Sequence, residues 1–127
     1  MAKRYLTICS ESETLGLVKP AFFHPKARAS LREFSDEVRE KIGVAIFELQ
    51  KGEKLSMPLS RPMPSIMAGV EELRIKDGSG AYRVFYFSRS PRGILIFHAF
   101  VKKTQKTPQR EIELGLKRLK EMLDEKE

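Results

Sequence analysis

Two arginines on neighbouring predicted strands are the residues best placed to do chemistry. Arg74 and Arg83 flank the turn-forming run Asp-Gly-Ser-Gly at residues 77–80. A hairpin centred on that run places Arg74 directly opposite Arg83 on one face of a sheet. Like charges at about 4 Å repel by about 4 kcal/mol at an effective dielectric of 20, so such a pair is typical of an anion site. Guanidinium groups bind phosphate oxygens in pairs, and phosphate is therefore the expected ligand.

His98 and Glu72 complete the pattern around these arginines. A second hairpin centred on Ser90 and Pro91 would place Arg83 opposite His98, so that Arg74, Arg83 and His98 form a row. Glu72 lies two residues before Arg74 and therefore on the same strand face, where it could pair with either arginine. Spacing alone leaves two interpretations open, a phosphate site and a structural cluster of ion pairs.

Lysines follow the last predicted strand. Lys102, Lys103 and Lys106 precede a helix that Thr107 and Pro108 open, and a helix N-terminus itself favours anions. A lysine cluster alone is more often a solvated face than a site. Beside a double-arginine face it indicates one wall of an RNA groove, to which Arg61 and Lys54 of the preceding loop are further candidate contacts.

The overall charge supports a polyanionic partner. The 127-residue chain carries a net charge of +7, and residues 51–103 hold 10 Lys and Arg against 4 Asp and Glu, which is +6. A basic field on one part of a small domain favours nucleic acid. With 41% hydrophobic and 32% charged residues, the chain can bury a core and remain soluble.

Periodicity predicts the elements that position these groups. Residues 17–23 read as a strand, and two helices follow, one from Pro25 and one capped by Ser35 and ending near Gly52. Residues 53–69 are predicted to be a loop. Residues 70–76, 81–88 and 93–101 are predicted strands of an antiparallel meander. A last helix buries a stripe made of Ile112, Leu116, Leu119 and Leu123.

These elements predict an α+β fold in the order β-α-α-β-β-β-α. The helical hairpin should pack on one face of the antiparallel sheet, where Tyr82 and Tyr86 also point. We expect one domain over residues 17–127. Residues 1–16 form an N-terminal extension that is either mobile or an additional strand.

Other chemistries have little support in the sequence. Cys9 is the only cysteine, which excludes an internal disulfide and any cysteine-rich zinc site. His24 and His98 are the only histidines, and no carboxylate spacing completes a metal site with them, so no metal or cofactor is expected. No apolar run suggests a membrane span or a signal peptide, and a cytoplasmic protein is the expectation.

Four segments together resemble phage-derived toxins of the RelE/HigB kind. They are residues 31–34, 71–75, 81–84 and the run His-Ala-Phe-Val-Lys-Lys-Thr-Gln-Lys-Thr-Pro at 98–108. The likeness extends over residues 17–123, and the run at 98–108 is its most specific part. It implies a RelE-like fold and an endoribonuclease that acts on mRNA, usually on the ribosome. It also implies a cognate antitoxin, often a helix-turn-helix repressor.

The resemblance also implies roles for individual residues. Arg74 and Arg83 match basic residues of the second and third strands of RelE, and Lys102 and Lys103 stand near its late basic residue. Two positions depart from the pattern, because Glu72 replaces a lysine and the late catalytic tyrosine has no counterpart.

Metal-free cleavage would use the 2′-hydroxyl of the RNA as nucleophile. Arg83 and Arg74 suit charge stabilisation, since a guanidinium stays protonated. Lys102 or Lys103 is the expected base or acid, with His98 as the rival. The main alternative function is a ParE-like toxin, which shares the fold and poisons DNA gyrase by binding without catalysis. A plain RNA-binding module is a third interpretation.

Overall fold

The elements follow the predicted order with one addition. The computed structural model describes residues 18–125, so the predicted extension at residues 1–16 lies outside the described residues. The elements are β1 (Ala21–Phe23), α2 (Pro25–Glu33), α3 (Asp36–Gln50), β2 (Ser60–Pro62), β3 (Val70–Asp77), β4 (Gly80–Ser90), β5 (Gly93–Lys102) and α4 (Gln109–Leu123). The prediction of an uninterrupted loop over residues 53–69 was wrong, because β2 forms there.

One sheet of five strands carries the fold, in the spatial order β1-β5-β4-β3-β2. The predicted meander of β3, β4 and β5 is confirmed, with antiparallel pairing throughout. β1 runs parallel to β5, which makes the sheet mixed and gives the predicted N-terminal strand its direction. The α+β class is confirmed, and the architecture is consistent with a RelE-like fold.

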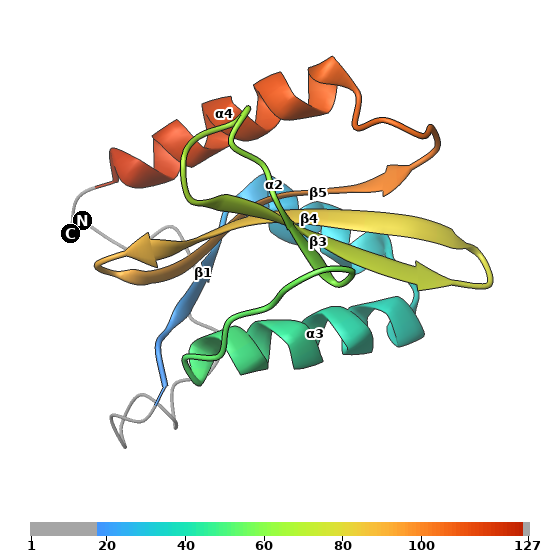
Figure 1. The fold of residues 1–127 in the computed structure, drawn as a ribbon, viewed down its shortest axis with the longest axis horizontal. Coiled ribbons are helices and arrows are strands. Elements are labelled where there is room, and N and C mark those ends of the chain that lie inside the picture. Colours follow the sequence, from blue (N-terminus) through green and yellow to red (C-terminus); the bar gives the residue numbers. More distant parts are fainter. Residues whose placement is uncertain (1–17, 126–127) are drawn as a thin grey trace.

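Helices cover both faces of this sheet, and each face has its own apolar core. Figure 1 shows α3 below the sheet and α4 above it. The lower core joins Leu31 of α2 and Phe34, the residue after α2, with the apolar stripe of α3, and it includes Tyr82 and Tyr86 as predicted. The upper core packs Leu119 and Met122 of α4 against strand residues such as Phe85. The upper face is the one that carries the charged residues described below.

Local signals in the sequence set the helix ends. The Nδ1 atom of His24 accepts a hydrogen bond from the backbone N–H of Lys26, ahead of Pro25 at the first turn of α2. Ser35 caps α3 by accepting from the backbone N–H of Val38, as predicted. Gly52 follows α3 with a φ of 94°, a conformation that disfavours side chains.

The buried stripe of α4 differs from the predicted one at its end. Leu119 is fully buried, and Ile112 and Leu116 pack partly against the same core. Leu123 is 39% exposed, whereas Met122 is 0% exposed, so the prediction of Leu123 in the stripe was wrong. A spacing of three residues from Leu119 fits the helical period as well as a spacing of four, and the sheet beneath selects Met122.

Candidate nucleic-acid interface

Strand register gathers four cations on the upper face of the sheet. Arg74 pairs directly with Arg83 across β3 and β4, as predicted. Ala81 pairs with Lys76 on one side and with Lys102 on the other. Because residues opposite each other in an antiparallel ladder point to the same face, these two rows bring Arg74, Arg83, Lys76 and Lys102 together.

A cleft opens between these rows and the loop after β5. It has a volume of about 530 Å³ and is lined by Arg74, Lys76, Ala81, Arg83, Lys102, Lys103, Thr104 and Gln105. A second hollow of about 320 Å³ shares Arg74, Lys76 and Arg83 and adds Pro58 and Leu59. Five of the lining residues are cationic and none is acidic, so the opening is suited to a polyanion.

Glu72 lies beneath the cations, with only 1% of its surface exposed. Its Oε1 atom is 3.4 Å from Arg61, 3.8 Å from Arg83 and 4.0 Å from Arg74. At these distances the groups form ion pairs, but they lie too far apart for ordinary hydrogen bonds. Within residues 18–125, the Oε1 atom of Glu72 and the Nε atoms of the three arginines have no hydrogen-bond partner. Glu72 therefore supplies negative charge to the cluster without a hydrogen bond from any of the three arginines to its Oε1 atom.

Arg83 is the most enclosed of these cations, with 4% of its surface exposed. Its guanidinium donates to the backbone carbonyl of Tyr82 at 3.1 Å, which fixes the direction of the side chain. Burial lowers the pKa of Arg83, the nearby carboxylate of Glu72 raises it, and Arg74 and Arg61 lower it further. The group remains a cation whose charge is poorly solvated and is available to an incoming anion.

The loop after β5 is tied to this cluster. Thr107 donates its hydroxyl to the second carboxylate oxygen of Glu72 at 2.9 Å. At the other end of the loop, Lys102 donates to the carbonyls of Thr104 and Gln105, each at 2.5 Å. Partial burial lowers the pKa of Lys102, and Arg83 lowers it further, whereas Glu72 acts in the opposite direction. A lysine with a lowered pKa is better suited to proton transfer than an ordinary one.

The predicted row of Arg74, Arg83 and His98 was wrong in its last member. Arg83 pairs with Phe100, and His98 pairs with Phe85, because the turn is centred between Pro91 and Arg92, with Ser90 opposite Gly93, and not between Ser90 and Pro91 as predicted. Two register shifts, between Phe87 and Ser90 and between Phe85 and Tyr86, cancel each other, so the position of the turn decides the partner of Arg83. His98 stays on the upper face, but it lies on β5 two residues before Phe100, the residue opposite Arg83.

His98 lies under α4 with 3% of its surface exposed. Arg118 donates to its Nδ1 atom at 2.7 Å, and the Nε2 atom is 2.6 Å from Glu111. Since a guanidinium can only donate, His98 must be neutral with its proton on Nε2, which donates to Glu111. Burial lowers the pKa of His98 and favours the same neutral form. Both ring nitrogens are thus engaged by α4, away from the cleft.

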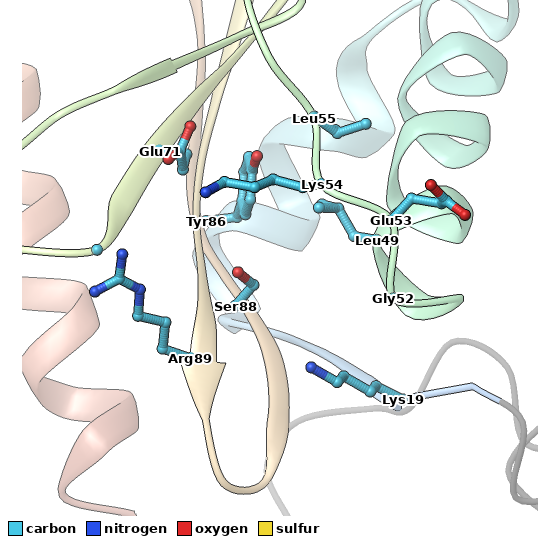
Figure 2. A pocket seen from close by; sticks show the side chains of 11 residues that line it. Lys19, Leu49, Gly52, Glu53, Lys54, Leu55, Glu71, Tyr86, Ser88 and Arg89 are labelled. Carbon is cyan, nitrogen blue, oxygen red and sulfur yellow. The ribbon is translucent and has the colours of Figure 1, made fainter.

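The remaining predicted site residues separate into two groups. Lys103 lines the cleft, Arg61 belongs to the Glu72 cluster, and Lys106 is an exposed residue of the same loop as Lys103. Lys54 lies elsewhere, in a pocket of about 350 Å³ that shares no lining residue with the cleft. Figure 2 shows Lys54 there with Glu71 and Tyr86.

Lys76 is a cleft residue that sequence reasoning missed. Lys76 lies two residues after Arg74 on the same predicted strand. Because alternate strand residues share a face, this spacing indicates that Lys76 lies beside Arg74 in the cleft.

Two further properties of the described residues concern metals and membranes. Within residues 18–125, no group of three or more His, Cys, Asp or Glu side chains is arranged to hold a metal ion. None of the helices found in this range combines the length and the apolar character that crossing a membrane requires.

The fold and the site define a class, a small α+β protein with a cation-lined cleft on one sheet face. The model of the phage-derived Gp49-like protein family (DUF891) matches residues 29–120, and the chain belongs to that family. The family is part of the RelE toxin–antitoxin superfamily, which implies a cognate antitoxin as partner. The resemblance to RelE is thereby confirmed at the level of the superfamily. No curated protein matches the chain.

Proposed function

We propose that the protein is a metal-independent endoribonuclease toxin that cleaves mRNA, on the ribosome, until its antitoxin neutralises it. The observation that carries the proposal is the pair Arg74 and Arg83, which line a cationic cleft and share Glu72 as a buried counter-ion. A phosphodiester is the ligand that guanidinium donors fit best. Membership of a toxin–antitoxin family supports the biological role.

The proposed reaction is an attack of the RNA on its own phosphate. The 2′-oxygen forms a bond to phosphorus while the bond from phosphorus to the 5′-oxygen breaks, leaving a 2′,3′-cyclic phosphate and a 5′-hydroxyl. One group takes the proton of the 2′-hydroxyl, and another gives a proton to the departing oxygen. The extra negative charge on the phosphoryl oxygens needs a fixed cation during the step.

Arg83 is the proposed charge-stabilising residue, and Arg74 assists from the facing strand. Both guanidinium groups stay protonated, so neither can take the proton. Lys102 is the proposed proton carrier because its pKa is lowered and it borders the same cleft. Lys103 is the alternative carrier. His98 is left out of the proposed mechanism, since α4 engages both of its ring nitrogens.

The surrounding cations would bind the RNA backbone. Lys76, Lys103 and Lys106 extend the cationic surface along β3 and the loop, and Arg61 adds charge from β2. Contacts of this kind position the RNA without reading its sequence. The antitoxin is proposed to be a helix-turn-helix repressor that places an acidic segment over this surface.

Expression of the chain in cells separates this function from gyrase poisoning. We expect growth to stop, translation to fall and mRNA to be cut before DNA supercoiling changes. The purified protein should cleave mRNA in the presence of a chelator, and assays with and without ribosomes should show faster cleavage with them. A response of gyrase while mRNA stays intact would establish the ParE-like function instead.

A further inference from the structure

An acid buried among the cations of the cleft needs a physical reason. We propose that Glu72 is a positioning residue, which holds the arginines and the loop after β5 in the arrangement that receives an RNA phosphate. The inference rests on the proposed function and deepens it. It concerns a residue that departs from the RelE pattern and that contacts no solvent-filled part of the cleft.

Glu72 balances the positive charge of the three arginines around it. Arg61, Arg74 and Arg83 all lie within 4.0 Å of a single oxygen, Oε1 of Glu72. Three guanidinium groups this close would move apart without a counter-charge. A carboxylate that is 1% exposed cannot be replaced by a mobile ion from solvent without rearranging the strands. Glu72 therefore keeps the arginines together when no RNA is bound.

Glu72 holds the arginines without a hydrogen bond to its Oε1 atom. A bidentate Arg–carboxylate pair would use two N–H groups of one arginine and would compete with phosphate. Here no hydrogen bond forms to Oε1, and the Nε atoms of Arg74 and Arg83 have no partner within the described part of the chain. The cluster is thus assembled by charge, and no hydrogen bond to Oε1 commits the guanidinium groups of Arg74 and Arg83, which line the cleft.

Glu72 also binds the loop that follows β5. The other oxygen of Glu72 accepts the hydroxyl proton of Thr107 at 2.9 Å, across 35 residues of sequence. Thr107 ends the loop that begins at Lys102, so this bond fixes the far side of the loop to β3. One carboxylate therefore connects the charge-stabilising arginines to the segment that carries the proposed proton donor and acceptor.

A positioning role and a plain electrostatic role predict different kinetics for Glu72→Gln. Removing a negative charge beside the cleft should leave RNA affinity equal or higher, because the surface becomes more positive. If Glu72 positions the arginines, kcat should nevertheless fall at least about tenfold, since small displacements of reacting groups are costly. A rise in kcat together with affinity would overturn the proposal and make Glu72 only a competing counter-ion. Unchanged kcat per folded molecule would overturn it as well.

Thr107→Val tests the link in a variant that keeps the buried charge. We expect kcat to fall about tenfold with an unchanged melting temperature, and Thr107→Ser should restore it by restoring the hydroxyl. Glu71→Gln is the matched control, because Glu71 is the neighbouring acid and bonds to Ser60 on the opposite face. It should leave kcat unchanged. Loss of activity in Glu71→Gln equal to that in Glu72→Gln would contradict the inference.

A measurement without cleavage separates this inference from the proposed nuclease activity. Backbone amide hydrogen exchange of residues 103–107 should accelerate in Thr107→Val and return to the wild-type rate in Thr107→Ser. Titration of the Lys102 side chain by NMR should give a lower pKa in Glu72→Gln, because the carboxylate raises it. If wild-type protein cuts no RNA, the nuclease proposal fails while the exchange result still decides the positioning role of Glu72, because the titration reports only its charge. Unchanged exchange would overturn that role.

Discussion

Arg74 and Arg83 lie directly opposite each other on β3 and β4, and both flank the same carboxylate oxygen of Glu72. The two arginines differ in their surroundings. The side chain of Arg74 is 30% exposed, whereas that of Arg83 is 4% exposed. Arg83 is therefore the more enclosed charge and should act on the reacting phosphate, while Arg74 faces solvent and should act mainly in binding.

Replacing Arg74 should weaken RNA binding with little effect on folding. In Arg74→Ala, Glu72 keeps Arg61 and Arg83 as partners, so the melting temperature should change little. The slope of log affinity against log salt should become shallower by about one, as expected for the loss of one phosphate contact. Arg32→Ala, at an exposed position of α2, is the control and should leave the slope unchanged.

The two substitutions Lys102→Met and Lys102→Arg distinguish charge from proton transfer. Arginine keeps the positive charge but cannot give up its proton. If Lys102 carries a proton, both variants should lose about 10²–10⁴-fold in cleavage, and the pH dependence of the residual activity should flatten. Lys117→Met, an exposed change on α4, is the control. Full activity of Lys102→Arg, with loss in the corresponding Lys103 variant, would assign the proton to Lys103.

Two helical glycines should respond to alanine with opposite signs. Gly43 in α3 has no atom within 4 Å of an added Cβ, so Gly43→Ala should stabilise the protein by about 0.5–1 kcal/mol. A Cβ at Gly115 in α4 would lie 2.8 Å from the ring of Phe85, and Gly115→Ala should cost about 1–3 kcal/mol. Urea unfolding measures both changes, and equal signs would contradict the packing of α4 on β4.

Stability should decline as pH falls through the range in which histidine titrates. Burial is the main cause that lowers the pKa values of His24 and His98 below the ordinary 6.5. The unfolded chain therefore binds more protons than the folded chain below that pH, and stability present above about pH 6.5 is lost as the pH falls.

Thermal melts between about pH 8 and about pH 5 measure this effect. Each kcal/mol lost should lower the melting temperature by about 2–8 °C. In the double variant His24→Gln/His98→Gln the slope of the melting temperature with pH should be smaller. The same slope in the wild type and the double variant would show that other groups govern it.

Features set by local residues could be predicted from the sequence. The turn run at residues 77–80 fixed the pairing of Arg74 with Arg83, and Ser35 marked the start of α3. Features set by distant contacts could not. The pairing of Arg83 with Phe100 depends on the exact centre of the turn at residues 91–92, which the turn residues at 90–93 left open, and β2 forms only because β3 offers its edge. The charge balance around Glu72 joins β2, β3, β4 and the loop, which no single segment reveals.

Arg83→Ala, followed by thermal melting and by RNA cleavage on the same preparation, tests the central claim most directly. We expect the Arg83→Ala variant to fold, because Arg61 and Arg74 still neutralise Glu72. We also expect a loss of about 10²-fold or more in cleavage per folded molecule, because one charge-stabilising donor is removed. A lower melting temperature with full specific activity would mean that Arg83 serves only to neutralise Glu72, and would contradict the account.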